Sequence, residues 1–206
     1  MPRLRPVFVE KRRLPRRFFS RETLPVARDL LGTYLVRVTG RGRLVGKIVE
    51  VEAYPGTGDP ASHSYNGETP RNAVMFGGGG RLYVYFTYGM HFCANIVTGK
   101  KGEGCAVLIR AVEPVEGLAR MVRNRDLDGE PADPRSLSGG PARVCQALGI
   151  TMRQNGTDLT GPELYIVTGE PVPDSGVVAT TRIGISSAKN KKWRFYLRDS
   201  PYVSKK

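Results

Sequence analysis

The 206-residue chain carries a formal net charge of +13, and 40 % of its residues are hydrophobic. The hydrophobic content is ordinary for a soluble globular protein, the length suits one domain with a sizeable core, and no apolar run is long enough to span a membrane. The charge indicates partners rather than fold, because strongly basic proteins bind polyanions. We expect a nucleic acid, with a membrane surface or a ribosome as the alternatives.

The first 17 residues form a basic segment that contains several prolines. Its positive side chains are Arg3, Arg5, Lys11, Arg12, Arg13, Arg16 and Arg17. It lacks the apolar stretch of a secretory signal, and its prolines disfavour, without excluding, the amphipathic helix of a mitochondrial presequence. We expect a flexible basic arm over residues 1–17 and a single domain over residues 18–206, in the cytoplasm (on a bacterial nucleoid) or in a eukaryotic nucleus.

Turn residues and hydrophobic spacing predict the first elements. A helix begins after Ser20 or Thr23 as the N-cap and ends at Leu31, before Gly32. Residues 34–38 and 44–54 form the strands of a hairpin around a basic, glycine-containing turn. Residues 55–72 are rich in turn formers and form a long loop, and long loops in compact domains are often functional.

The remaining chain is mostly strand. Strands are predicted over residues 73–76, 81–87, 92–98, 107–112, 164–167, 177–185 and 193–197, with a turn at residues 88–91. Helices are predicted over residues 114–124 and 140–148. Few βαβ units and no internal repeat appear, so we expect a single α+β domain with a largely antiparallel, curved sheet, a protruding β-hairpin and flanking helices.

Metal and cofactor motifs are missing from the sequence. The three cysteines match no zinc spacing, and there are only two histidines, so we expect buried thiols in a reducing compartment. We find no Rossmann fingerprint, nucleophile elbow or iron–sulfur motif. The glycines at residues 77–80 are not followed by the Gly-Lys-Ser/Thr of a phosphate loop. We therefore expect no metal and no cofactor.

Two carboxylates and a tyrosine alternate along the strand at residues 49–54. Glu50, Glu52 and Tyr54 share one face, while the intervening apolar side chains face the core. The two carboxylates could lie in solvent, hold Mg²⁺ or act in acid–base chemistry. The Mg²⁺ nuclease is the weaker choice, because no lysine follows at close spacing. One carboxylate acting as a general base is sufficient for hydrolysis.

Aromatic residues concentrate in and after the strand at residues 81–87. Tyr83 and Tyr85 share a face, and we expect Tyr83 to pack in the core. Tyr88 and Met90 lie at a hairpin tip, where side chains are usually polar. Tyr88 is either packed there or a wedge that fills the gap left by a displaced base. His63, in the long loop, is either an exposed or capping residue or a contact to phosphate or base.

Taken in order, these segments resemble the alkyladenine (3-methyladenine) DNA glycosylase family of the mammalian type, from about residue 18 to the C-terminus. The matching segments are VEVEAY (49–54), SHS (62–64), TPRN (69–72), MF (75–76), LYVY (82–85), YGM (88–90), FCAN (92–95), VLIRAVEP (107–114), GPARVCQAL (140–148), RIGI (182–185), RFY (194–196) and SPYVS (200–204). His91 departs from the family, which often has another aromatic residue there, and the arm before Phe18 has no counterpart.

The resemblance implies a role for each matched residue. Glu52 is expected to deprotonate the water that attacks C1′ of the damaged nucleotide, and Arg110 to position that water. The base pocket is expected to consist of Tyr54, His63, Tyr85, Asn95, Met75 and Leu108, with Asn95 clashing with the 2-amino group of guanine. Tyr88 and Met90 are expected to enter the duplex. Arg71, Arg125 and Arg143 are expected to contact the DNA backbone.

The implied function is a monofunctional DNA N-glycosylase of base excision repair, acting as a monomer on double-stranded DNA that contains damaged purines. An alkylated purine is cationic, so it leaves with little acid assistance, and the faces of Tyr54 and Tyr85 attract it. The expected substrates are 3-methyladenine, hypoxanthine, 7-methylguanine and ethenoadenine. The matched active-site segments contain no lysine, so we expect no strand cleavage. The rival is a non-catalytic binder of DNA or RNA, which would have no use for Glu52 beside a stacking pocket.

Overall fold

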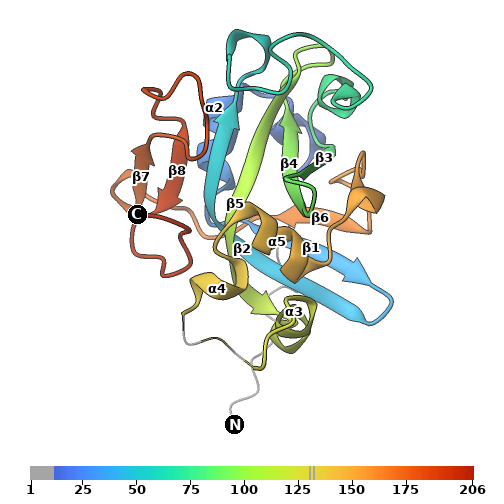
Figure 1. Ribbon diagram of the computed structural model, residues 1–206, viewed down its shortest axis with the longest axis vertical. Helices are drawn as coiled ribbons and strands as arrows, with labels where there is room; N and C mark the ends of the chain where they lie inside the picture. The colour runs from blue at the N-terminus through green and yellow to red at the C-terminus, as the bar shows by residue number, and fades with distance from the viewer. Residues whose placement is uncertain (1–11, 130, 132) are drawn as a thin grey trace.

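The computed structural model describes residues 12–129, 131 and 133–206. They form one eight-stranded sheet (Figure 1). Six strands lie in the order β3-β4-β5-β2-β1-β6. The other two extend the sheet beside β2: β8 pairs with β2, and β7 pairs with β8. Every strand pair is antiparallel. The predicted α+β class with an antiparallel sheet is therefore confirmed.

The elements follow one another along the chain as helices and strands. The strands are β1 (Tyr34–Thr39), β2 (Gly42–Tyr54), β3 (Leu82–Thr87), β4 (His91–Thr98), β5 (Cys105–Glu116), β6 (Leu164–Val167), β7 (Val177–Thr180) and β8 (Arg194–Leu197). The α-helices are α1 (Arg16–Phe19), α2 (Thr23–Leu30), α3 (Leu118–Asn124), α4 (Arg135–Ser138) and α5 (Pro141–Leu148). Short 3₁₀ helices are η1 (Gly56–Gly58), η2 (Ala73–Gly77), η3 (Met152–Gln154) and η4 (Asp174–Gly176).

Strand β2 is the centre of the sheet. Its first half pairs with β1, its second half with β8, and β5 runs along its other edge. The β2–β5 register shifts between Ile48 and Glu50 and again between Glu50 and Val51. Such bulges bend a strand and redirect its side chains, often beside active sites. Glu50 therefore lies at two of these register shifts, and Glu52 follows two residues later.

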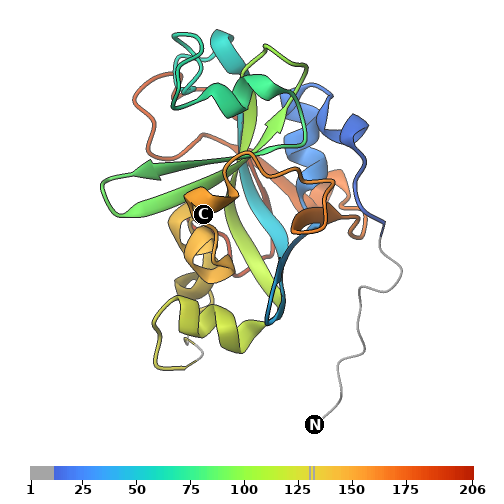
Figure 2. The same cartoon turned by 90° about the vertical axis from the view of Figure 1, so that its right-hand side faces the viewer.

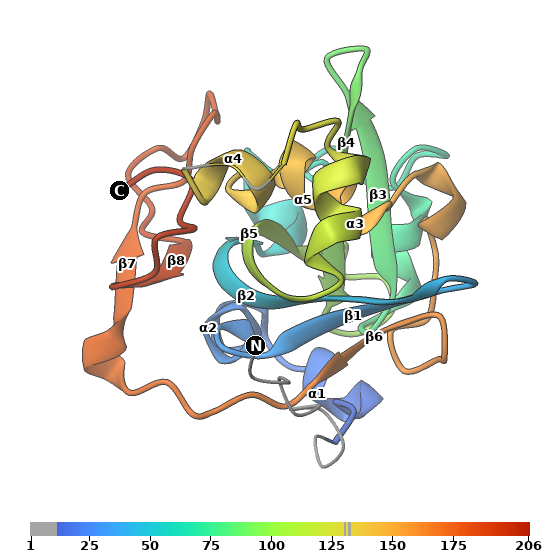
Figure 3. The ribbon, with the colours of Figure 1, turned by 90° about the horizontal axis from the view of Figure 1, so that it is seen from below.

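The core fills the space between the sheet and its helices. Figure 3 shows α2 on one side of the β1–β2 hairpin and α3, α4 and α5 on the other. Val26 and Leu30 of α2 and Val144 and Leu148 of α5 are fully buried, as expected for helices with one apolar face. In the part of the chain that the structure describes, no helix is long and apolar enough to cross a membrane.

The β3–β4 hairpin extends away from the body of the protein (Figure 2). Its tip is a tight turn in which the Met90 N–H donates to the Thr87 carbonyl at 3.3 Å. Both central residues, Tyr88 and Gly89, have positive φ angles, 51° and 68°. This pattern is typical of a type I′ turn, whose twist matches that of the flanking strands. The hairpin predicted from the sequence is confirmed.

Two predictions near the middle of the chain are wrong. Residues 73–76 are not a strand but part of the 3₁₀ helix η2, and consecutive Met75 and Phe76 are both buried, which alternation along a strand would not allow. The helix predicted from residue 114 begins only at Leu118. Pro114 still pairs with Gly46 in the sheet, and β5 continues to Glu116 before the chain turns.

The predicted strand over residues 177–185 is also too long. It ends at Thr180, because Arg182 turns into the interior and pairs with Asp59, far from β7 in the sequence. At the N-terminal end of the chain, the predicted flexible arm includes residues 12–17. In the structure Arg13 bridges to Val167 and Leu14 is buried. The start of the predicted arm, residues 1–11, lies outside the described residues.

Candidate active site

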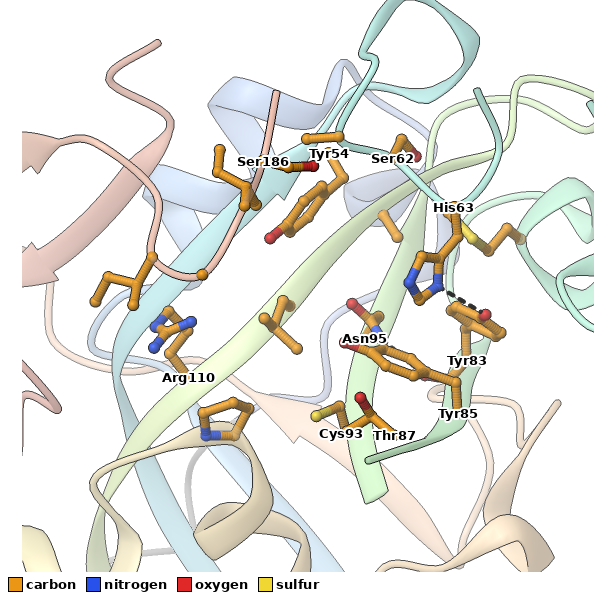
Figure 4. A pocket seen from close by; sticks show the side chains of 18 of the residues that line it. Tyr54, Ser62, His63, Tyr83, Tyr85, Thr87, Cys93, Asn95, Arg110 and Ser186 are labelled. Carbon is orange, nitrogen blue, oxygen red and sulfur yellow. Dashed lines mark hydrogen bonds between the residues drawn. The ribbon is translucent and has the colours of Figure 1, made fainter. Parts of the chain in front are cut away.

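A cavity of about 450 Å³ opens between the β3–β4 hairpin and the end of β2. Its walls come from the C-terminal end of β2, the loop at residues 60–63, β3, β4, β5 and the loop at residues 183–186. This volume lies in the range of pockets that hold small organic ligands. Figure 4 shows Tyr54, His63, Tyr85, Asn95 and Arg110 pointing toward a common space.

Glu52 lies directly behind the cavity wall and is completely buried. Its Oε2 accepts a hydrogen bond from the Tyr54 hydroxyl at 2.9 Å, and its Oε1 accepts one from the Ile183 N–H at 2.7 Å. Nη1 of Arg110 lies 3.3 Å from the same Oε1. Tyr54, Arg110 and Ile183 all line the cavity. The carboxylate is thus buried, compensated by one cation and connected to the pocket through all three partners.

Glu50 is equally buried and shares Arg110 with Glu52, but its other partners differ. Arg110, Arg194 and Ser204 all donate hydrogen bonds to its carboxylate. The interpretation of Glu50 and Glu52 as a solvated pair is therefore wrong. Protein donors occupy both oxygens of Glu50, so the pair also offers no shared open face to a Mg²⁺ ion. Within the described residues, no group of three His, Cys, Asp or Glu side chains is arranged to hold a metal.

One wall of the cavity is aromatic. The rings of His63 and Tyr85 meet edge to face at 4.5 Å between centroids, and Tyr83 stacks on Tyr85 at 5.7 Å. Nδ1 of His63 lies 3.1 Å from the Tyr83 hydroxyl, the contact drawn in Figure 4. Tyr83 lines the cavity although its exposed fraction is only 1 %. The pocket role of Tyr83 was missed, although its spacing of two from Tyr85 placed it on the same face.

The environment keeps these side chains uncharged. Burial, and then the nearby positive charge of Arg71, lower the pKa of His63. Burial raises the pKa of Tyr83 to about 12. It also raises the pKa of Tyr54 and Tyr85, and the carboxylate of Glu52 acts in the same direction on both. At neutral pH the wall therefore presents a neutral imidazole and three intact phenols.

Tyr54 is fixed from behind by a buried ion pair. The central carbon of the Arg182 guanidinium lies over the rings of Tyr54 and Trp193, 4.6 Å and 4.9 Å from their centroids. Arg182 pairs with Asp59 through two hydrogen bonds, and neither side chain is exposed. Sequence reasoning gave Arg182 and Asp59 no role. They are 123 positions apart, so no local pattern links them.

The other predicted pocket residues lie around the same cavity. Met75, Leu108 and Asn95 are buried and line it, and the side-chain amide of Asn95 donates to the Tyr83 carbonyl at 3.2 Å. The loop at residues 183–186 also lines it, a contribution that was not predicted. In the sequence, the RIGI motif (182–185) contributes only to the family resemblance.

The residues expected to touch DNA occupy several positions. Tyr88, at the hairpin tip, is 85 % exposed and borders the cavity, whereas Met90 is exposed outside it. Arg71 is exposed at the rim. Arg143 is exposed in the first turn of α5, where it donates to two backbone carbonyls. Arg125 donates to the carbonyls of residues 136 and 137 and contacts Gln146, so its hydrogen-bonding groups serve the fold.

Comparisons with known proteins identify the family of this chain. The family model described as "Methylpurine-DNA glycosylase (MPG)" matches residues 17–201. A protein of Carboxydothermus hydrogenoformans named "Putative 3-methyladenine DNA glycosylase" is 53 % identical over 194 residues, covering 94 % of this chain and 99 % of its own. A protein of Methanoculleus marisnigri with the same name is 50 % identical, with 94 % and 99 % covered. The chain belongs to the methylpurine-DNA glycosylase family.

Proposed function

We propose that this protein is a monofunctional DNA glycosylase of base excision repair. It removes 3-methyladenine, hypoxanthine, 7-methylguanine or ethenoadenine from double-stranded DNA and leaves an abasic site. The family supports a DNA glycosylase acting on methylated purines. The observation that carries the mechanism is the buried Glu52 carboxylate, joined to Arg110 and Tyr54 at the wall of an aromatic pocket.

The base leaves the duplex before it reacts, because C1′ is not accessible inside the stack. Tyr88 enters the gap as the base leaves, and the basic surface, including Arg71 and Arg143, holds the phosphates. The flipped purine lies among Tyr54, His63 and Tyr85. Stacking on such rings contributes about 1–3 kcal/mol per base and offsets part of the cost of unstacking.

In the chemical step Glu52 takes a proton from a water molecule. The water oxygen forms a bond to C1′ while the bond from C1′ to the purine nitrogen breaks, and its electron pair leaves with the base. A purine alkylated at N3 or N7 is cationic and leaves as a neutral molecule, so no strong general acid is needed for it. Hypoxanthine and ethenoadenine are uncharged in the nucleotide, and each takes up a proton from solvent as it leaves. Arg110 balances the charge of Glu52 and lines the cavity, from where it orients the water.

The pocket limits both the substrates and the outcome. We propose that the Asn95 amide clashes with the 2-amino group of guanine, and its bond to the Tyr83 carbonyl, which holds the amide in place, supports this role. No lysine is among the described residues that line the cavity, so no amine is placed to form the Schiff base that leads to strand cleavage. We propose that the enzyme acts as a monomer.

Base release from defined duplexes tests this function. The protein is incubated with duplexes that each carry one lesion, in EDTA, and abasic sites are detected by alkaline cleavage. We expect release from at least one of the four lesions, and Glu52→Gln should abolish it while the Kd for lesion DNA changes less than about threefold. Normal release by Glu52→Gln would overturn the mechanism, and loss of wild-type activity in EDTA would indicate a metal-dependent enzyme.

A further inference from the structure

A second buried carboxylate lies two residues before Glu52. Glu50 Oε1 accepts hydrogen bonds from Arg110 Nε at 3.2 Å, Arg194 Nη1 at 2.8 Å and Ser204 Oγ at 3.0 Å, and its Oε2 accepts one from the Ser204 N–H at 2.7 Å. Its exposed fraction is zero. Burying a carboxylate costs several kcal/mol unless such donors compensate it. Nothing in the proposed chemistry gives Glu50 a contact with the substrate.

Glu50 and Glu52 share the same arginine. Arg110 donates a hydrogen bond through Nε to Glu50, and its Nη1 forms an ion pair with Glu52 at 3.3 Å, so two carboxylates fix the orientation of one guanidinium. An arginine side chain has many rotamers, and ordering it costs conformational entropy. If Glu50 were neutral, Arg110 would pair with Glu52 alone. The guanidinium would then compete directly with water for the oxygens of Glu52.

A second connection runs through Arg194. This residue bonds Glu50, and its Nε donates to the Thr181 carbonyl at 3.0 Å. Thr181 begins the loop in which Ile183 donates its N–H to Glu52 at 2.7 Å. Glu52 Oε1 therefore has two partners that are linked to Glu50. Arg110 bonds Glu50 directly, and the loop that contains Ile183 is bonded to Arg194, which bonds Glu50.

The end of the chain belongs to the same cluster. Ser204 contributes its backbone N–H and its hydroxyl to Glu50, and the carbonyl of Lys205 accepts a bond from Arg194 at 2.7 Å. The contacts between Glu50 and Ser204 span 154 positions of sequence. The C-terminal residues thus stabilise the distorted part of β2 directly beside the proposed general base.

We infer that Glu50 is a positioning residue for base release: it orients Arg110 and the loop at residues 181–183 against Glu52 and anchors the C-terminal residues to that arrangement. This inference rests on the proposed glycosylase function. Misplacing a reacting group by about 1 Å can reduce a rate about 100-fold. Removal of the Glu50 charge should therefore slow the chemical step without weakening the binding of damaged DNA.

The experiment compares Glu50→Gln with Glu116→Gln under single-turnover conditions on a duplex that carries one lesion released by the wild type in the assay above. Glu116 pairs with Arg43 on the same sheet, away from the cavity, and provides the matched control. We expect the release rate of Glu50→Gln to fall about 10- to 100-fold, with the Kd for the duplex unchanged within about twofold. Glu116→Gln should change neither quantity by more than about twofold. Circular dichroism confirms that each variant is folded.

Each other result has a definite meaning. If Glu50→Gln releases the base at the wild-type rate while Glu52→Gln is inactive, the inference fails and the proposed function stands. Parallel losses of rate and binding would show a merely structural role and also overturn the inference. If Glu50→Gln does not fold, Ser204→Ala is tested instead, because it removes the hydroxyl that donates to Glu50. We then expect the rate of base release to fall about threefold or more and the Kd for the duplex to stay unchanged. A wild-type protein that releases no lesion overturns the proposed function itself.

Discussion

The guanidinium of Arg182 lies over the ring of Tyr54, with 4.6 Å between its central carbon and the ring centroid. Asp59 accepts hydrogen bonds from this guanidinium, and the ring of Trp193 also lies against it, with 4.9 Å between the central carbon and the ring centroid. Tyr54 in turn donates its hydroxyl to Glu52. A buried ion pair therefore supports the aromatic ring that joins the base pocket to the proposed general base.

Substitution of Asp59 by asparagine should strongly destabilise the fold. The variant leaves Arg182 as a buried cation without its counter-charge, and breaking a buried pair in this way costs about 3–5 kcal/mol. The free energy of unfolding is measured by urea denaturation. As the control, Asp174→Asn breaks the pair with Arg28, in which the Asp174 side chain is 96 % exposed, and should cost less than about 1 kcal/mol. Equal effects for the two variants would contradict the structural role of the Asp59 pair.

Replacement of Tyr88 by alanine should weaken binding to duplex DNA. Tyr88 is exposed at the hairpin tip and has a φ of 51°, a conformation that L residues rarely adopt and that is often retained for function. If its ring fills the gap left by the base, Tyr88→Ala should reduce affinity for lesion duplexes about tenfold or more, and affinity for single strands much less. Tyr88→Phe keeps the ring and should bind normally. Equal losses on both DNA forms would show that Tyr88 is not a wedge.

The protonation of His63 provides a third measurement. Burial and the charge of Arg71 lower its pKa, so we expect the imidazole to titrate below its usual value of about 6.5. Nuclear magnetic resonance of the ring protons gives this pKa, with His91→Gln to assign the two histidine signals. Arg71→Gln should raise the pKa of His63. Titration of His63 above 6.5 in the wild type would show that the ring is not held in this environment.

The lowered pKa of His63 also determines how the free energy of unfolding changes with pH. As pH falls through about 6.5, the unfolded chain takes up a proton at His63 before the folded protein does. The contribution of His63 therefore lowers the free energy of unfolding as the pH decreases through that range. His63→Gln should lose less stability than the wild type between pH 7.5 and pH 5.5, as measured by urea denaturation at each pH.

Local patterns were sufficient for much of the fold. The β1–β2 and β3–β4 hairpins follow from alternating side chains and turn residues, which act over a few positions. Alternation along β2 placed Glu50, Glu52 and Tyr54 on one side, and in the structure both carboxylates contact Arg110 while Tyr54 bonds Glu52. The helix over Leu118–Asn124 was extended too far back, because Pro114 is a good first residue for a helix as well as an acceptable edge residue.

Contacts between distant segments were not predictable in this way. Arg182 pairs with Asp59 and Ser204 with Glu50 across more than 100 positions, and neither pair has a local signal. The family resemblance named Arg125 as a backbone contact, but it does not reveal that α4 and α5 occupy its donors. A family resemblance assigns an expected role to a residue from its position in a motif. The hydrogen-bond partners of that residue depend on the packing of the whole chain.

Asn95 is the position at which base selectivity can be altered. Its side chain is 4 % exposed, and its amide is held by the Tyr83 carbonyl, so it cannot rotate away from an incoming guanine without losing that bond. Asn95→Ser shortens the side chain and opens space for the 2-amino group. Discrimination of this kind amounts to about 10- to 200-fold. We therefore expect Asn95→Ser to increase release of 7-methylguanine relative to hypoxanthine, and to begin releasing normal guanine, in the single-lesion assay. An unchanged ratio would show that Asn95 does not exclude guanine.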